Sequence, residues 1–234
     1  MLPSPLFRDR EAAGQELALA VFEEFTRLTA ATNPDWQPLA TAQPIVYGLP
    51  RGGIPVAAAI AEKLNCPFDV VIAKKITRPE DPELAIGAIA TTGEVLWTQP
   101  QPWHLHRTKI YQAALQATLE KAQLQLTQFS SIRPQTEPEG AITILVDDGI
   151  ATGMTIAVAA QALRQQKPAQ IWICAPVAPL ELVEWLRQWS DRLILLATPP
   201  DFSSVSRFYQ NFPQVELGEA LTYLQNQSHI IRSP

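Results

Sequence analysis

Residues 144–155 read Ile-Leu-Val-Asp-Asp-Gly-Ile-Ala-Thr-Gly-Met-Thr, and this stretch decides the fold. The apolar run over 142–146 predicts a buried strand, and the small residues at 149–153 predict a tight turn. A helix is expected directly afterwards, over 154–166. A buried strand that passes through a short turn into a helix is the building unit of α/β proteins with a parallel sheet.

A second segment shows the same order of elements. Another apolar run, 45–49, predicts a buried strand, and it leads through the turn at 50–53 into a helix over 54–64. Pro55 falls in the first turn of this helix, where proline is tolerated. The next expected strand, 68–76, completes one strand–helix–strand unit.

The rest of the chain continues the alternation. We expect strands over 171–176 and 193–197, helices over 9–28 (capped by Asp9), 103–129, 180–189 and 217–226, a hairpin of 85–90 and 94–97 around a turn at 91–93, and loops at 30–44, 77–84 and 130–140. These elements predict an α/β fold with a doubly wound, mostly parallel sheet and helices on both faces. Ligands bind such sheets beyond the carboxyl ends of the strands, where both glycine-rich turns lie.

The composition is that of a globular protein with a hydrophobic core. Of 234 residues, 47% are hydrophobic and 18% are charged. No apolar run reaches the roughly 18 residues that a membrane span requires, and the first residues do not resemble a secretory signal. The two cysteines, Cys66 and Cys174, are too few for a disulfide framework or a four-cysteine zinc site, and we expect them in the core. These observations predict a cytoplasmic protein.

The charge distribution argues against a nucleic-acid-binding protein. The chain has 18 Lys and Arg against 23 Asp and Glu, a net charge of −5, and no basic run longer than Lys74-Lys75. Its three histidines, at 104, 106 and 229, have no metal-ligand partners in the sequence, and His104 and His106 are expected on the surface at the start of a helix. Five of the ten glycines fall in two short segments, 48–53 and 149–153, which we therefore take as the candidate binding loops.

The loop that follows the strand at 142–146 has the chemistry of a phosphate site. Its turn and the start of the next helix offer free N–H groups, to which Thr152 and Thr155 could add hydroxyl donors. Asp147 and Asp148, just upstream, would accept hydrogen bonds from a polyol such as ribose. The alternative is a plain turn at Asp148-Gly149 with Thr152 as a helix cap. The glycine patterns of P-loop and dinucleotide-binding proteins are absent from the sequence.

The loop at 48–53 can bind an anion by similar means. The bare backbone of Gly52 and Gly53 allows close approach, and Arg51 can make a bidentate contact. The alternative is an ordinary turn with a solvated arginine. Lys74 or Lys75, near the end of the next expected strand, could face the same anion or an acceptor, or both could be solvated.

The stretch ILVDDGIATGMT resembles the phosphoribosyl pyrophosphate (PRPP) binding motif of type I phosphoribosyltransferases. The segments LPRGGIPVA (49–57), AKKITRPEDPELAIGAIA (73–90) and FYQNF (208–212) are similar to a poorly characterised bacterial branch of that family. The resemblance runs from about Phe7 to Phe212. The chain departs from the branch at Thr77 and Glu80, where that branch tends to have glycines.

The resemblance implies a role for each loop. Asp147 and Asp148 would bind the ribose hydroxyls and hold Mg²⁺, directly or through water, and with Arg51 they are the expected catalytic residues. The 5-phosphate would be bound by Gly149, Ile150, Ala151, Thr152, Gly153, Met154 and Thr155. The diphosphate would be bound by Arg51, Gly52 and Gly53, with Lys74 and Lys75 as further candidates.

The activity implied is transfer of the 5-phosphoribosyl group from PRPP to a small-molecule acceptor, with release of diphosphate. The motif does not identify the acceptor, which could be a purine, a pyrimidine or another amine; the aromatic tail favours a planar nitrogenous base. The resemblance also implies a homodimer and a single domain over 1–234, with a core of about 40–200. The helix at about 9–29 and the tail at about 200–234 would form parts of a hood or of the dimer interface.

Other residues have less specific expectations. Phe202, Phe208 and Tyr209 could stack on a planar base, or they could pack the tail onto the core. The loop 77–84 could act as a lid, with Asp81 and Glu83 as acid–base or metal-positioning groups, although loops are commonly polar in any case.

Two other classes of function remain as alternatives. One is a non-catalytic regulator that senses PRPP or a nucleotide. The other is a sugar-phosphate phosphatase or hydrolase, which would need a nucleophile or a dense metal cluster, and the sequence offers neither.

Overall fold

The computed structural model describes residues 5–30, 42–78, 81–98, 109–134 and 136–230. Its main sheet has five strands in the order β2-β1-β6-β7-β8, and every neighbouring pair is parallel. The strands are β1 (Pro44–Gly48), β2 (Phe68–Val70), β6 (Ile142–Val146), β7 (Gln170–Val177) and β8 (Arg192–Ala197).

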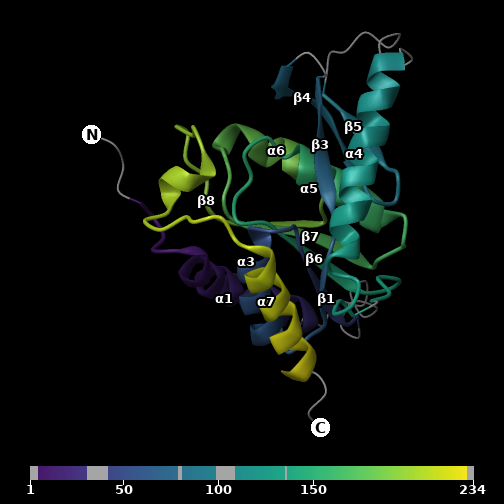
Figure 1. The fold of residues 1–234 in the computed structure, drawn as a ribbon. Coiled ribbons are helices and arrows are strands. Elements are labelled where there is room, and N and C mark those ends of the chain that lie inside the picture. Colours follow the sequence, from purple (N-terminus) through teal and green to yellow (C-terminus); the bar gives the residue numbers. More distant parts are fainter. Residues whose placement is uncertain (1–4, 31–41, 79–80, 99–108, 135, 231–234) are drawn as a thin grey trace.

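Helices cover both faces of this sheet (Figure 1). One face packs on α1 (Arg10–Thr29), α3 (Gly53–Leu64) and α7 (Leu217–Ile230), and the other on α5 (Met154–Arg164) and α6 (Val183–Leu186). The reason is the alternation of side chains along each strand. Val46 and Ile144 face the first helix layer, and their neighbours Tyr47 and Leu145 face the second. The predicted doubly wound fold is confirmed.

Helix α1 forms as the sequence predicts. The Asp9 carboxylate caps it by accepting a hydrogen bond of 2.8 Å from the Ala12 amide. Its apolar positions Ala13, Leu17 and Val21 are fully buried, and the helix packs against α3.

A second, smaller sheet contains β3 (Ala73–Arg78), β4 (Asp81–Ala90) and β5 (Val95–Trp97), all antiparallel. One side of it packs on α4 (Lys109–Thr127), and the other packs on α5. The expected hairpin is therefore confirmed as β4 and β5, and Gly93, with φ of +99°, lies in its turn.

Two of the predicted boundaries in this region are wrong. The expected single strand 68–76 is divided, because the chain leaves the parallel sheet after Val70 and enters the antiparallel sheet at Ala73. The expected loop 77–84 is largely strand, since 77–78 end β3 and 81–84 begin β4. Pro82 lies near the start of β4, where the described residues pair with β3 but not with β5, whose partners are 87–89. A proline is compatible with such an edge position because it has no N–H group to donate to a second neighbouring strand.

The expected helix 180–189 is also shorter in the structure. A 3-10 turn at Leu180–Leu182 leads into α6, which ends at Leu186. The expected helix 103–129 is observed as α4, and its predicted start, with His104 and His106, lies outside the described residues. Among the described residues, no helix combines the length and apolarity needed to cross a bilayer.

We expect both cysteines to be unreactive in the folded protein. Cys66 and Cys174 are buried, and burial raises the pKa of the Cys66 thiol to about 12 and raises the pKa of Cys174 as well. At pH 8, fewer than about one thiol in 1,000 would be ionised, so a thiol reagent should label neither residue until the protein is unfolded in guanidinium. Rapid labelling of the native protein at pH 8 would contradict this burial.

Candidate functional site

The two glycine-rich loops leave neighbouring strands of the main sheet. From β1 the chain passes through α3 to β2 on one side, whereas from β6 it passes through α5 to β7 on the other. Gly48 and Val146 are paired at the ends of these strands, and the Leu49 amide donates to the Val146 carbonyl at 2.9 Å. The crevice where connections diverge in this way is the usual ligand site of open α/β sheets.

The two loops touch at the aspartates. A Cβ atom added to Gly52 would lie 2.0 Å from Asp148 Oδ2. One added to Gly53 would lie 2.7 Å from the Val146 carbonyl oxygen and 2.9 Å from Asp147 Cα. A side chain at either position would therefore force the Asp148 carboxyl group or the backbone at 146–147 to shift, and the fold brings the predicted diphosphate loop against the predicted ribose-binding carboxylates.

Each loop leads into a helix without a side-chain cap. Gly52 precedes α3 and Gly153 precedes α5, and neither helix start receives a side-chain hydrogen bond. The first N–H groups of a helix have no partner within it and favour an anion. In α3 the Gly53 amide, which the sequence predicts to donate to the diphosphate, instead donates to the Leu49 carbonyl at 3.0 Å. This hydrogen bond holds the loop closed on itself. The peptide bond between Pro50 and Arg51 is cis.

The predicted 5-phosphate loop contains exposed polar residues and buried apolar ones. Ala151 and Thr152 are exposed, and Thr155 is half-buried. Ile150 and Met154 are buried, and the Ile150 amide donates to the Val177 carbonyl at 2.9 Å. A Cβ atom on Gly149 would lie 2.4 Å from Val205 Cγ1, so the start of the loop is packed closely against the chain beneath it.

The carboxyl groups of Asp147 and Asp148 lie in a poorly solvated position. Asp147 Oδ1 accepts a hydrogen bond of 2.9 Å from the Asp148 amide. Burial raises the pKa of Asp147 well above its usual range, and the neighbouring Asp148 raises it further. Burial also raises the pKa of Asp148, against the opposing effect of the Arg10 guanidinium. Such a pair favours a ligand that brings hydroxyl donors or positive charge.

Arg10 is the site residue that the sequence reasoning missed. Its Nε donates to Asp148 Oδ2 at 2.7 Å, across 138 positions of sequence. The spacing of the sequence could have indicated that Arg10 is buried. Arg10 lies three, seven and eleven positions before Ala13, Leu17 and Val21, so it continues the buried stripe of α1. A charged residue on such a stripe indicates a buried partner.

The predicted basic residues are brought together only in part. Arg51 Nη1 lies 3.8 Å from Oε2 of Glu216, a side chain that is 73% exposed, and such exposed pairs contribute little. Burial lowers the pKa of Lys74, and the positive charges of Lys121 and Arg51 lower it further, which places Lys74 within the electrostatic range of the Arg51 loop. Lys75 is exposed and, as the next residue of β3, projects from the opposite face of the strand.

The aromatic residues of the tail pack against one another. The Phe202 ring stacks on Phe208 with 5.2 Å between centroids, and Tyr209 contacts Phe7 and Phe212 at 5.4 and 4.7 Å. Phe208 and Tyr209 are buried. These contacts favour the packing alternative, and stacking on an acceptor remains a prediction.

Of the two acidic residues considered for the 77–84 segment, Asp81 is exposed at the start of β4. The side chain of Glu83 lies outside the described residues.

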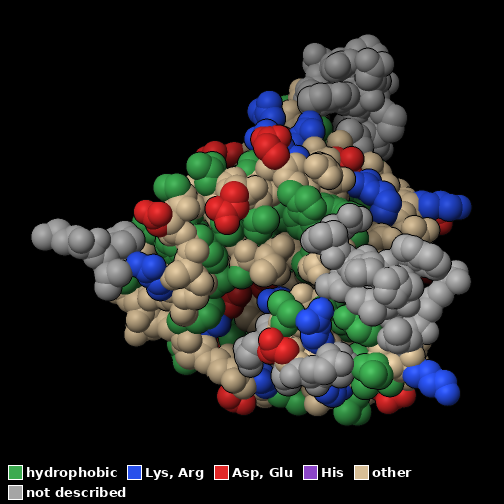
Figure 2. All heavy atoms as spheres, turned by 90° about the horizontal axis from the view of Figure 1, so that it is seen from above, with side chains coloured by type: hydrophobic (Ala, Val, Ile, Leu, Met, Phe, Trp, Pro, Cys, Tyr) green, Lys and Arg blue, Asp and Glu red, His purple; other side chains and the backbone are tan. Residues whose placement is uncertain are grey.

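Within the described part of the chain, no three His, Cys, Asp or Glu side chains cluster as a metal site. The adjacent carboxyl groups of Asp147 and Asp148 could instead contribute to a Mg²⁺ ion that keeps most of its waters. Figure 2, the view from above, shows a hollow in which acidic and basic side chains lie close together.

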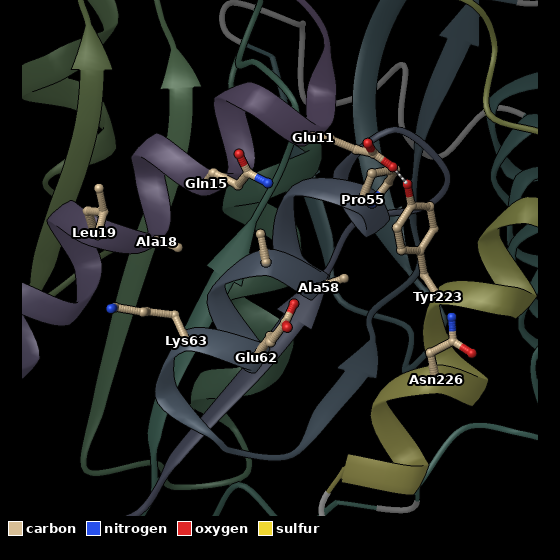
Figure 3. Close-up of a pocket in the computed structure, with 11 residues that line it drawn as sticks. Glu11, Gln15, Ala18, Leu19, Pro55, Ala58, Glu62, Lys63, Tyr223 and Asn226 are labelled. Carbon is tan, nitrogen blue, oxygen red and sulfur yellow. Dashed lines mark hydrogen bonds between the residues drawn. The ribbon is translucent and has the colours of Figure 1, made fainter.

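A separate cavity of about 860 Å³ lies between α1, α3 and α7 (Figure 3). Its lining includes Pro55 but no residue of the two glycine-rich loops. The Tyr223 hydroxyl donates to the Glu11 carboxylate at 2.5 Å, so that two residues of its lining join α7 to α1. We therefore place the candidate site at the loops and not in this cavity.

Comparison with known proteins identifies the family of the chain. Residues 18–195 match the family described as "Phosphoribosyl transferase domain". A protein of Mycobacterium tuberculosis, present in strains H37Rv and CDC 1551 and named provisionally as a phosphoribosyl transferase, is 32% identical over 223 residues. The match covers 94% of this chain and 46% of the relative, so the chain spans about half the length of the curated relatives it matches.

A solved structure gives the same result for the fold. The protein TT1426 from Thermus thermophilus is 30% identical to this chain with a TM-score of 0.73, and the match covers 94% of this chain and 98% of that one. The matched family segment includes both glycine-rich loops and the strands that present them. The chain belongs to the phosphoribosyl transferase domain family.

Proposed function

We propose that this protein is a PRPP-dependent phosphoribosyltransferase, which transfers the 5-phosphoribosyl group to a nitrogenous base and releases diphosphate. The observation that carries the proposal is the contact between the loops, in which a Cβ on Gly52 would lie 2.0 Å from Asp148 Oδ2. Because the loops touch, one PRPP molecule can reach both, with its ribose at the aspartates and its diphosphate at Arg51.

The proposed reaction is a displacement at ribose C1. The lone pair of an acceptor nitrogen forms the new bond to C1, and the bond from C1 to the diphosphate oxygen breaks, so that diphosphate leaves with the electron pair. An acceptor nitrogen that carries a hydrogen then releases that proton to water. The carboxylates of Asp147 and Asp148 would orient the ribose and stabilise positive charge on it. Arg51 and Lys74 would neutralise the leaving diphosphate. Catalysis would then rest on positioning and electrostatics, without a covalent intermediate.

The 5-phosphate would be bound at the other end of the ribose. The uncapped start of α5 supports this, since its first N–H groups and the positive end of the helix dipole favour a phosphate. The exposed Thr152 and the half-buried Thr155 would add hydroxyl donors. Ile150 and Met154 are buried and would support the loop from beneath.

We also propose that Mg²⁺ accompanies PRPP. Two adjacent carboxyl groups, Asp147 and Asp148, fit an ion whose other ligands are water and phosphate oxygens, and they would hold it through water. When bound, the ion would neutralise charge on the diphosphate.

The test is a calorimetric titration of PRPP with and without Mg²⁺. We expect about micromolar, Mg²⁺-dependent binding to the wild type, and a loss of at least about 100-fold in the double variant Asp147→Asn/Asp148→Asn. Asn has nearly the same size as Asp but carries no negative charge. The substitution therefore removes the charge with which the side chain would bind the ribose hydroxyls or Mg²⁺. The exposed Asp201→Asn is the matched control and should bind like the wild type.

The outcomes separate the candidate functions. Binding together with diphosphate release in the presence of one of a panel of purines and pyrimidines supports the transferase. Binding without release for any base in the panel would favour a PRPP sensor instead. A folded wild type that does not bind PRPP overturns both functions.

A further inference from the structure

Arg10 is held in an unusually enclosed position for an arginine. Its side chain is 10% exposed, and that of its partner Asp148 is 13% exposed. A guanidinium group removed from water in this way is unfavourable unless it is paired and hydrogen-bonded. The ion pair between Nε and Asp148 Oδ2, at 2.7 Å, provides that pairing.

Two more contacts fix the orientation of the Arg10 guanidinium. Its Nη1 donates to the Pro213 carbonyl at 2.6 Å, and its Cζ lies 3.6 Å from the centre of the Phe212 ring. A planar group held on three sides has little freedom to rotate. Because the guanidinium is fixed, the Asp148 carboxyl group that it binds is fixed too.

The backbone of Asp148 is held by a second residue, Tyr209, from the segment that follows β8. The Tyr209 hydroxyl donates to the Asp148 carbonyl at 2.6 Å. Tyr209 forms a parallel bridge with Phe7, and the Leu6 and Phe7 amides both donate to the Phe208 carbonyl at 2.9 Å. The segments 6–10 and 208–213 are thus joined to each other where they reach the site, and each makes one contact with Asp148.

We propose that Arg10 is a positioning residue of the ribose site, which sets the orientation of the Asp148 carboxylate, with Tyr209 supporting it from the tail. This inference rests on the proposed function. A carboxylate that accepts hydrogen bonds from ribose hydroxyls binds best when its direction is fixed before the ligand arrives. The first turn of α1 and the segment 209–213 are therefore part of the PRPP site, although neither carries a binding motif.

The test compares PRPP, titrated in the presence of Mg²⁺, with inorganic diphosphate, titrated without Mg²⁺ so that its binding does not depend on an ion held by Asp148. We expect Arg10→Gln to weaken PRPP binding by about 10–100-fold, the range typical of residues that orient a ligand-binding group. Arg10→Lys should recover part of that loss because it keeps the charge. Binding of inorganic diphosphate should change less than about threefold, since diphosphate is assigned to the Arg51 loop. Arg27→Gln, an exposed position of the same helix, is the matched control.

The outcomes also separate this inference from the proposed function. Equal weakening of PRPP and diphosphate would mean that Arg10 acts only on the general stability of the fold, and would overturn the inference. So would a folded Arg10→Gln variant that binds PRPP like the wild type. A wild type that binds no PRPP would overturn the proposed function, and this inference with it.

If Arg10→Gln does not fold, Tyr209→Phe carries the same test, because it deletes a single hydroxyl. We expect it to weaken PRPP binding by about 3–10-fold with diphosphate binding unchanged. In turnover assays with a competent base, the loss in both variants should be in the KM for PRPP more than in kcat, whereas unchanged KM values would contradict the positioning role.

Discussion

Replacing Gly52 with alanine should reduce PRPP affinity by about 100-fold or more, although it adds only one methyl group. Gly52 has φ of −63° and ψ of −36°, which alanine adopts without strain. The effect comes from space, because the new Cβ would lie 2.0 Å from Asp148 Oδ2. Arg10 and the surrounding packing hold that carboxylate, so it cannot move aside without losing its ion pair. Either the Asp148 carboxylate or the Arg51 loop must shift. In both cases the group that would bind the ribose moves away from the loop that would bind the diphosphate.

Stability and binding can be measured on the same Gly52→Ala variant. Overpacking of this kind lowers the free energy of unfolding by about 1–3 kcal/mol, so the variant should remain folded at 25 °C. Gly218→Ala is the control, since a Cβ at Gly218 would meet nothing within 4 Å, and it should leave PRPP binding unchanged. If folded Gly52→Ala binds PRPP as tightly as the wild type, the contact between the loops is not part of the binding site.

The sequence predicts the framework of this site because its signals are local. Apolar runs of five residues mark β1 and β6, and their parallel pairing follows from the helix that comes after each. Once the strands are parallel neighbours, Arg51, Asp147 and Asp148 must meet at one edge of the sheet. Only the three-dimensional structure shows how closely they meet, as in the approach of Gly52 to Asp148.

Other features depend on contacts that are distant in sequence. Residues 70–73 are all apolar and contain no turn signal, yet the chain divides there into β2 and β3. The division arises because Phe68–Val70 pairs with β1 and the residues from Ala73 pair with β4. The ion pair of Arg10 with Asp148 links residues 138 positions apart. The helical periodicity of α1 shows that Arg10 is on the buried face, but it does not show which acid lies opposite.

Gly153→Ala should lower both the stability of the fold and the affinity for PRPP, for two separate reasons. Gly153 has φ of +74°, in the left-handed region, where a Cβ atom costs about 1–2 kcal/mol. Its added Cβ would also lie 2.4 Å from Cζ3 of Trp185, a bulky side chain packed against Trp189. We expect the free energy of unfolding to fall by about 2–4 kcal/mol in urea titrations. PRPP affinity should fall by about 100-fold, because Gly153 begins the helix that the 5-phosphate would contact.

Gly140→Ala allows the two causes to be separated. Gly140 has nearly the same φ, +71°, but a Cβ there would meet nothing within 4 Å. Its loss of stability should therefore be about 1–2 kcal/mol, from the backbone alone, and its PRPP affinity should equal that of the wild type. The difference between the two variants measures the contact with Trp185. Equal losses of stability, or wild-type PRPP binding by folded Gly153→Ala, would show that the start of α5 is not held in the geometry on which the proposed 5-phosphate site depends.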